Sequence, residues 1–211
     1  MRTIKWLIFS LLTLLLWSGC ASNYMEITPQ QIEYSATDEK DGVLLHYKYD
    51  LLRRDYGGNE GRKGTKFLAV KISNNSGREL ALGKEIRLWN SEGEEVGPIQ
   101  QEALYKDLKQ RPANYLLYLS IIPMSFLIAK GYETKDVQVF DTNVARFGTF
   151  FGLAATFGNV YQSSSANKKF KKNLLQHDIY GKPIPNGETV YGLIGIKADT
   201  TEVLHLKIYK D

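Results

Sequence analysis

The chain has 211 residues, 27 Lys and Arg against 23 Asp and Glu, and 43% hydrophobic residues. This composition suits one or two globular domains and excludes a disordered, collagen-like or multi-span membrane protein. One cysteine, Cys20, permits no internal disulfide or thiolate cluster, and three histidines supply few metal ligands. We therefore expect no metal, no cofactor and no enzymatic activity.

The N-terminus has the pattern of a signal peptide. Arg2 and Lys5 are followed by Leu7 to Trp17, an apolar run of eleven residues that only Ser10 and Thr13 interrupt. Because a permanent membrane-spanning helix needs about 20 apolar residues, this run is too short, and a small-residue site follows it directly. Residues 1–19 are thus expected to be a removable signal peptide.

The residues at the end of this run are Ser18, Gly19 and Cys20. They resemble the lipobox of bacterial lipoproteins, in which the cysteine is diacylated, becomes the first residue after cleavage and is usually N-acylated. The resemblance implies a palmitate-type lipid anchor at Cys20, which holds the protein to a membrane of the cell envelope. Two or three acyl chains make a stable anchor where one chain is marginal.

Residues 20–30 are expected to form a lipidated polar tether. Cys20 is followed by Ala21, Ser22 and Asn23. An Asp directly after the cysteine would resemble a signal that retains lipoproteins in the inner membrane, and this Asp is missing. This favours the outer membrane, facing the periplasm, over the inner membrane. Removal of the signal peptide leaves 25 basic and 23 acidic residues, so the near-neutral charge gives no argument for nucleic acid.

Residues 31–100 and 179–211 have the patterns of β-strands. In 42–52, Val43, Leu45 and Tyr47 alternate with polar residues, as in a half-buried antiparallel strand, and 66–73 alternates in the same way. Toward the C-terminus, 189–197 and 202–209 predict a hairpin. Prolines in the segment before it exclude that segment from a central strand.

The strand and turn motifs of 70–77, 88–93 and 185–192 are similar to those of immunoglobulin-like envelope lipoprotein domains of unassigned function. This resemblance covers about half of the chain. It implies a mainly β fold, an immunoglobulin-like antiparallel β-sandwich. Because strands are predicted at both ends of the chain around a different middle, 101–178 is expected to be an insertion. The glycine-rich segment 57–65 is expected to be a flexible connection between two strands, because it lacks the order of a phosphate-binding loop.

The insertion, 101–178, predicts a short helix at 101–111 and then an apolar helical hairpin. Residues 113–129 and 147–167 contain no charged residue. The second stretch carries Gly148 and Gly152 at a spacing that lets another helix approach closely. It is followed by four lysines that are able to contact lipid phosphates, namely Lys168, Lys169, Lys171 and Lys172.

Two hypotheses remain open for this hairpin, which spans 113–172. It inserts into the bilayer to which Cys20 ties the protein, or its helices pack on the sandwich and on each other. The sequence accordingly predicts a noncatalytic binding or assembly component of the cell envelope with an unidentified protein partner. Alternatives are a membrane-active protein and an envelope hydrolase, whose carboxylates cannot be paired from sequence.

Tyrosines form a further candidate contact surface. Tyr24, Tyr34, Tyr56 and Tyr132 lie outside the apolar stripes of the expected strands. Such amphipathic rings suit contacts with protein or carbohydrate.

Overall fold

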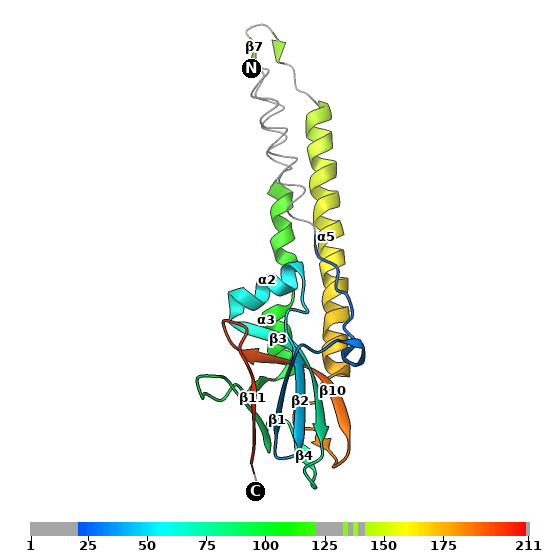
Figure 1. Ribbon diagram of the computed structural model, residues 1–211. Helices are drawn as coiled ribbons and strands as arrows, with labels where there is room; N and C mark the ends of the chain where they lie inside the picture. The colour runs from blue at the N-terminus through cyan, green and yellow to red at the C-terminus, as the bar shows by residue number, and fades with distance from the viewer. Residues whose placement is uncertain (1–20, 121–132, 135–136, 139–141, 210–211) are drawn as a thin grey trace. The chain divides into compact units, whose positions relative to one another are not determined.

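The computed structural model of the chain describes residues 21–120, 133–134, 137–138 and 142–209 (Figure 1). The described residues form two compact units. One unit, here called the helical unit, comprises 21–23 and 110–166, and the other, the β body, comprises 24–109 and 167–209. The predicted signal peptide and Cys20 lie outside the described residues.

A five-stranded antiparallel sheet forms the centre of the β body. Its strands, in spatial order, are β1 (Ala36–Lys40), β2 (Val43–Lys48), β3 (Thr65–Asn74), β10 (Thr189–Lys197) and β6 (Pro98–Ile99). The strands predicted within 42–52, at 66–73 and at 189–197 are confirmed as β2, β3 and β10.

One tight turn and one pairing between distant segments build this sheet. The turn between β1 and β2 consists of Asp41 and Gly42, both with positive φ, of 50° and 78°. Two such residues form the tight turn that matches the twist of an antiparallel hairpin. Figure 1 also shows β10, from the C-terminal part of the chain, beside β3, and the register pairs Val70 with Gly192.

Smaller sheets accompany the large one. β5 (Ile86–Trp89) pairs with β11 (His205–Ile208), and β4 (Leu80–Ala81) pairs with β9 (Pro183–Ile184). The predicted C-terminal hairpin is therefore wrong, because β10 and β11 belong to different sheets. Within the helical unit, β7 (Glu133–Thr134) pairs with β8 (Val137–Gln138).

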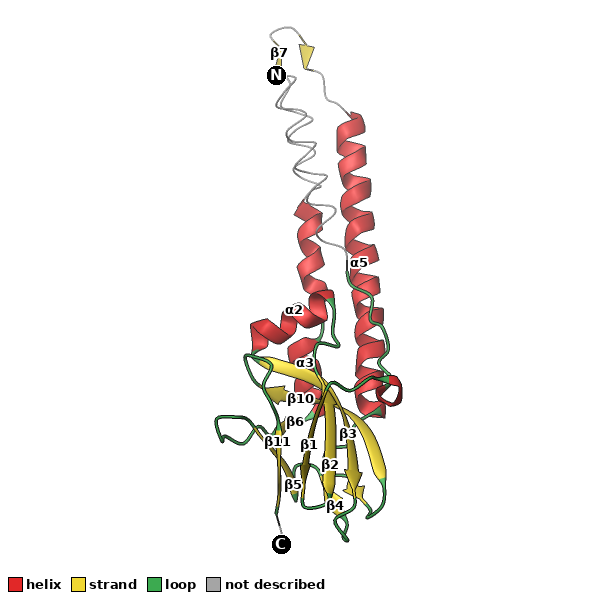
Figure 2. Cartoon of the chain, viewed as in Figure 1, coloured by secondary structure: helices red, strands yellow, loops and turns green. Residues whose placement is uncertain are grey.

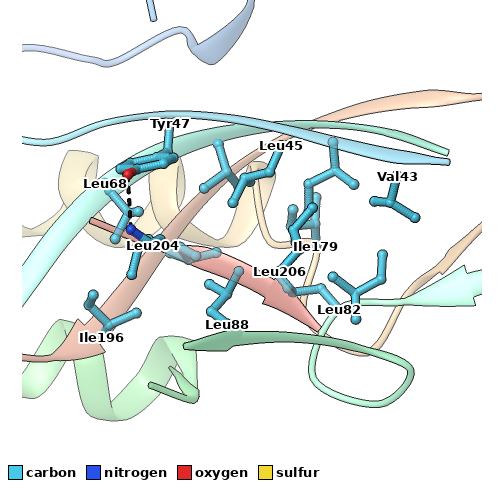
Figure 3. Close-up of a cluster of buried hydrophobic side chains, with 14 of the residues drawn as sticks. Val43, Leu45, Tyr47, Leu68, Leu82, Leu88, Ile179, Ile196, Leu204 and Leu206 are labelled. Atoms are coloured by element: carbon cyan, nitrogen blue, oxygen red, sulfur yellow. Dashed lines mark hydrogen bonds between the residues drawn. The ribbon is translucent and has the colours of Figure 1, made fainter. Parts of the chain in front are cut away.

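The main apolar core draws on the five-stranded sheet and on the smaller sheets of the β body (Figure 3). Alternate residues of β2 and β3 point into it, as the period of two requires. The fold is thus a mixed α/β arrangement with a mostly antiparallel sheet. The buried members of this core include Val43, Leu45, Tyr47, Leu68, Val70, Ile72, Leu82, Leu88, Ile194, Ile196, Leu204 and Leu206.

Side chains of β1 and β2 bind backbone groups of β11 and of the residue just before it. The Tyr47 hydroxyl accepts the Leu204 N–H at 2.9 Å, drawn as a dashed line in Figure 3. Asp38 Oδ2 accepts the Leu206 N–H at 2.7 Å, and its Oδ1 lies 3.3 Å from His205 Nδ1. These bonds join β11 to the first two strands without a regular strand pairing.

Helices lie beside the sheet within the β body (Figure 2). They are α2 (Arg54–Lys63), α3 (Gln101–Leu108), the 3-10 turn η1 (Pro29–Gln31), and the C-terminal end of α5 (Thr142–Gln176). The helix predicted at 101–111 is confirmed as α3. The 3-10 helix η2 (Pro112–Ser120) belongs to the helical unit.

The expectation of a flexible connection at 57–65 is wrong, because most of this segment is α2. Tyr56 and Glu60, four residues apart, are buried on one face of the helix. Gly64 ends the helix at a left-handed φ of 53°, and its N–H bonds to the Glu60 carbonyl. The burial of two side chains therefore offsets the low helix propensity of the glycines.

A second, aromatic core lies on the face of β3 opposite to Leu68 and Val70. The Phe170 ring has its centroid 5.1 Å from that of Tyr24, 5.0 Å from that of Tyr56 and 6.2 Å from that of Phe67. Tyr24 and Tyr56 are 5% and 1% exposed, so their assignment to a contact surface is wrong. Tyr34 is half-buried, and Tyr132 lies outside the described residues.

Candidate functional site

The helical unit contains the apolar stretches that the sequence singled out for membrane contact, whereas the four lysines that follow them belong to the β body. Its described residues include η2 and the part of α5 up to Ala166. The uncharged stretch 147–167 falls within α5. The side chains of 121–145, 147 and 148 lie outside the description, and so does most of the first predicted apolar helix.

The buried face of α5 in this unit is small and polar. Gly152, Thr156, Asn159 and Ser163 follow each other at intervals of four, three and four residues, which places them on one side of the helix. Thr156 is 1% exposed, Asn159 8% and Ser163 0%. None of these side chains is the large apolar type that usually covers the buried face of a helix in a soluble protein.

The opposite side of the same helix carries large apolar side chains. Phe150, Phe157 and Tyr161 are 70%, 67% and 78% exposed, and Leu153 is 39% exposed. Their spacing of three, four and four residues again defines one face. We call these four residues the aromatic face. The distribution of polarity around α5 is thus inverted relative to a helix that meets water.

The buried polar groups of this helix have hydrogen-bond partners. Thr156 Oγ1 donates to the Gly152 carbonyl at 2.7 Å, and Ser163 Oγ donates to the Val160 carbonyl at 3.1 Å. Asn159 Oδ1 accepts the Ala21 N–H at 2.7 Å. Because an unsatisfied buried polar group is costly, these bonds make a polar interior tolerable.

The start of the described chain is held in the helical unit by side-chain amides. Gln110 Oε1 accepts the Ser22 N–H at 3.1 Å, and Gln110 Nε2 donates to the Ser22 carbonyl at 2.6 Å. Ala21 and Ser22 are each 2% exposed. We call Asn159 and Gln110, with the backbone of Ala21 and Ser22, the N-terminal clamp.

The predicted tether, residues 20–30, has buried residues in its described part. The first two residues of this part are buried in the helical unit. Further along, Tyr24 and Pro29 are buried in the β body, where Asn173 bonds both the N–H and the carbonyl of Ile27 at 3.0 Å. This stretch is therefore held at several points, with exposed residues between them.

The four lysines at the C-terminal end of α5 fall into two groups. Lys168, Lys169 and Lys172 are exposed. Lys171 instead forms an ion pair with Glu102 at 2.9 Å, and its Nζ lies 5.2 Å from the centroid of the Tyr105 ring. The hydrogen bond from Lys171 lowers the pKa of Glu102. Three of the four lysines are thus available for an external anion, and Lys171 binds within the β body.

The two glycines of the predicted helix-packing motif both lie in α5, and Gly152 is buried. Sequence patterns did not reveal the clamp. Asn159 and Gln110 are single amides, and their backbone partners are more than 85 residues away in the chain. The only signal was Asn159 itself, a polar residue inside an uncharged helical stretch.

The chain was compared with protein-family models, with curated proteins and with solved structures, and nothing matched in any of the three. Among the residues that the structure describes, no group of three His, Cys, Asp or Glu side chains is arranged to hold a metal ion. Within the same residues, no helix combines the length and hydropathy that crossing a membrane requires.

Proposed function

We propose that this chain is a noncatalytic, lipid-anchored protein of the cell envelope whose helical unit engages the bilayer through its aromatic face. The observation that carries the proposal is the inverted polarity of α5, with Thr156, Asn159 and Ser163 buried and Phe150, Phe157 and Tyr161 exposed. An aromatic face is unfavourable in water and favourable in an apolar solvent.

The energetics support lipid contact. Burial of one large apolar side chain contributes roughly 1.5–3 kcal/mol, so removal of the aromatic face from water yields several kcal/mol. An anchor at Cys20 raises the effective concentration of the helical unit at the membrane surface, and little intrinsic affinity is then needed. The absence of any charged side chain between Arg146 and Lys168 removes the main penalty for entry into lipid.

Lipid attachment at Cys20 follows from the lipobox resemblance, and the outer membrane is the favoured location because no Asp follows the cysteine. The exposed lysines at 168, 169 and 172 fit phosphate groups at an anionic surface. For the β body we propose an immunoglobulin-like sandwich. Support comes from the core that the five-stranded sheet shares with the β5–β11 and β4–β9 pairs.

A second candidate function, assembly with an envelope protein, is favoured by β5 and β11. Lys207 Nζ lies 3.2 Å from the centroid of the Trp89 ring, and the Arg87 guanidinium lies 4.7 Å from that of Tyr209. Trp, Tyr and Arg are the residue types that dominate the binding energy of protein interfaces. A partner that copurifies with the mature protein and is lost in Trp89→Ala would support this function.

Flotation with vesicles tests the membrane proposal. Residues 21–211, the mature chain without the lipidated Cys20, are produced and centrifuged with vesicles of phosphatidylglycerol and phosphatidylethanolamine. We expect this chain to float, and the variant Phe150→Ser/Phe157→Ser/Tyr161→Ser to stay at the bottom of the gradient. A wild-type chain that stays at the bottom contradicts the proposal.

A matched control removes as many exposed apolar side chains from the β body. Met25, Leu175 and Val203 are 71%, 53% and 55% exposed. The variant Met25→Ser/Leu175→Ser/Val203→Ser should float as the wild type does. Equal loss of flotation in both triple variants would indicate nonspecific adhesion rather than a membrane-facing helix.

A further inference from the structure

The N-terminal clamp and the aromatic face belong to the same unit and to neighbouring turns of α5. Asn159, which binds the Ala21 N–H, is two residues from Tyr161 and nine residues from Phe150. At 1.5 Å per residue, the clamp lies about 3 Å along the axis from Tyr161 and about 14 Å from Phe150. The start of the mature chain is therefore fixed near one end of the aromatic face.

This end precedes the lysine cluster along the chain, and the other end, at Phe150, lies four residues after a single charged residue, Arg146. Lys168 follows Tyr161 by seven residues, whereas 147–167 contains no charged residue. Tyrosine has an amphipathic ring that is enriched at the boundary between lipid and water, and phenylalanine has none of its polarity. The order Tyr161, Phe157, Leu153, Phe150 thus runs from a residue suited to the membrane surface to residues suited to its interior.

The dimensions match one leaflet. The hydrocarbon core of a bilayer is about 30 Å thick, so one leaflet contributes about 15 Å. The axial rise from Asn159 to Phe150 is about 14 Å. Acyl chains on Cys20 would begin within one residue of Ala21, because consecutive Cα atoms are about 3.8 Å apart. The anchor and the aromatic face can therefore occupy the same leaflet.

We propose that the N-terminal clamp sets the depth at which the helical unit enters the membrane. The acyl chains of Cys20 leave the protein at the level of Asn159, Tyr161 lies at the headgroups, and Phe157, Leu153 and Phe150 lie successively deeper among the acyl chains of the same leaflet. Asn159 and Gln110 are the positioning residues. This inference rests on the proposed function and adds to it a direction and a depth.

Lipid is the occupant that the chemistry of the helix favours over a second copy of the chain. An interface with another copy needs an apolar surface on one side only. Here every exposed residue between Phe150 and Tyr161 is uncharged, including Ala154 and Gly158, which lie outside the aromatic face. A helix without charge on any exposed side suits a surrounding apolar solvent.

Depth-dependent quenching in the full acylated chain tests the proposal. With the Cys20 thiol acylated, Phe150→Cys, Phe157→Cys and Tyr161→Cys each introduce one free thiol for a bimane label, and the unsubstituted protein controls for background labelling. Vesicles carry lipids with a nitroxide at acyl carbon 5 or at carbon 12. We expect the ratio of shallow to deep quenching to fall from 161 to 150, by about twofold or more over an axial rise of about 16 Å.

The outcomes separate this inference from the proposed function. Labels that are quenched without an order, or in the reverse order, overturn the depth assignment alone. Labels that no nitroxide quenches, in protein that floats through its anchor, overturn both the depth assignment and membrane engagement by the aromatic face. Disulfide-linked dimers through position 150 or 157 in the unlabelled variants, without quenching, identify a second copy as the occupant and overturn both in the same way.

The role of the clamp has its own test. Asn159→Leu and Gln110→Leu remove the hydrogen bonds to Ala21 and Ser22 while they keep a similar volume. In these two variants the difference in the ratio of shallow to deep quenching between labels at 161 and at 150 should become smaller, although flotation through Cys20 is retained. Gln162→Leu, which changes an exposed amide on the same helix, should leave the ratio unchanged. An unaltered ratio in both clamp variants contradicts the positioning role.

Discussion

The phenolic hydroxyl of Tyr47, on β2, accepts the backbone N–H of Leu204 just before β11, at 2.9 Å. The two residues are 157 positions apart, and both are buried. Tyr47 therefore combines an apolar ring in the core with an acceptor for a backbone group that no strand pairs. This bond stabilises the approach of the last strand to the large sheet.

We expect Tyr47→Phe to lower the free energy of unfolding by about 1–3 kcal/mol, because the Leu204 N–H is then buried without an acceptor. The ring stays, so no cavity adds to the loss. Urea unfolding monitored by circular dichroism measures the change. Tyr209→Phe, at a tyrosine that is 39% exposed, is the control and should be close to neutral. Equal stability of Tyr47→Phe and wild type would contradict this role.

This contact also shows where prediction from sequence ended for the fold. The alternation of Val43, Leu45 and Tyr47 correctly predicted a half-buried strand, because a period of two fixes which side chains share a face. It did not fix the partner strand. Residues 189–197 and 202–209 therefore suggested a hairpin, whereas β10 pairs with β3 and β6, and β11 pairs with β5.

For the candidate site, the sequence located the uncharged stretch of α5 but not the orientation of its residues. Thr156 and Phe157 are both uncharged, so the absence of charge does not tell which of them is buried, although Thr156 is 1% and Phe157 67% exposed. The clamp depends on the distant pair Asn159 and Ala21. Contacts of this kind arise from the tertiary arrangement, and no local pattern encodes them. For the same reason, the sequence does not distinguish Lys171 from Lys168, Lys169 and Lys172.

Glu60 predicts a dependence of stability on pH. Burial raises the pKa of this carboxyl from 4.5 to about 6, although the Phe67 N–H, which donates to Glu60 Oε1 at 2.7 Å, partly opposes the shift. Because the pKa of Glu60 is higher in the folded than in the unfolded chain, its contribution to the free energy of unfolding is complete below pH 4.5. This contribution decreases as the pH rises toward 6 and is constant above that value.

We expect Glu60→Gln to remove this decrease, since the amide carbonyl still accepts the Phe67 N–H without a buried charge. Relative to wild type, the variant should gain about 1 kcal/mol between pH 5 and 7. Urea midpoints measured across this range give the difference. For the control variant Glu94→Gln, at an exposed carboxyl, the urea midpoint should depend on pH as it does in wild type. If the urea midpoints of Glu60→Gln and wild type change with pH in the same way, burial does not perturb the Glu60 carboxyl.

Phe170 predicts a large loss of stability on truncation. Its ring is 0% exposed and contacts the rings of Tyr24, Tyr56 and Phe67. Phe170→Ala should cost about 3–5 kcal/mol, because the aromatic core loses apolar contacts and retains a cavity. The thermal midpoint of the purified chain reports the change. Leu175→Ala, at a residue 53% exposed on the same helix, should cost less than about 1 kcal/mol.

The exposed lysines predict how binding to vesicles depends on charge. Each lysine near an anionic surface contributes about 1 kcal/mol, so Lys168→Gln/Lys169→Gln/Lys172→Gln should weaken binding of the unlipidated chain to phosphatidylglycerol vesicles by up to about 100-fold. The effect should fade at high salt, since salt screens exposed charges.

Two controls separate position from net charge in this experiment. Lys40→Gln/Lys63→Gln/Lys84→Gln removes three exposed lysines of the β body that lie outside α5, and this variant should have a smaller effect. Lys171→Gln breaks the ion pair with Glu102 and should change binding little, because this lysine is already engaged. If both triple variants weaken binding equally, the attraction depends on overall charge, and the end of α5 has no special part in it. A Lys171→Gln variant as weak as the α5 triple variant would show that its pair with Glu102 opens at the membrane.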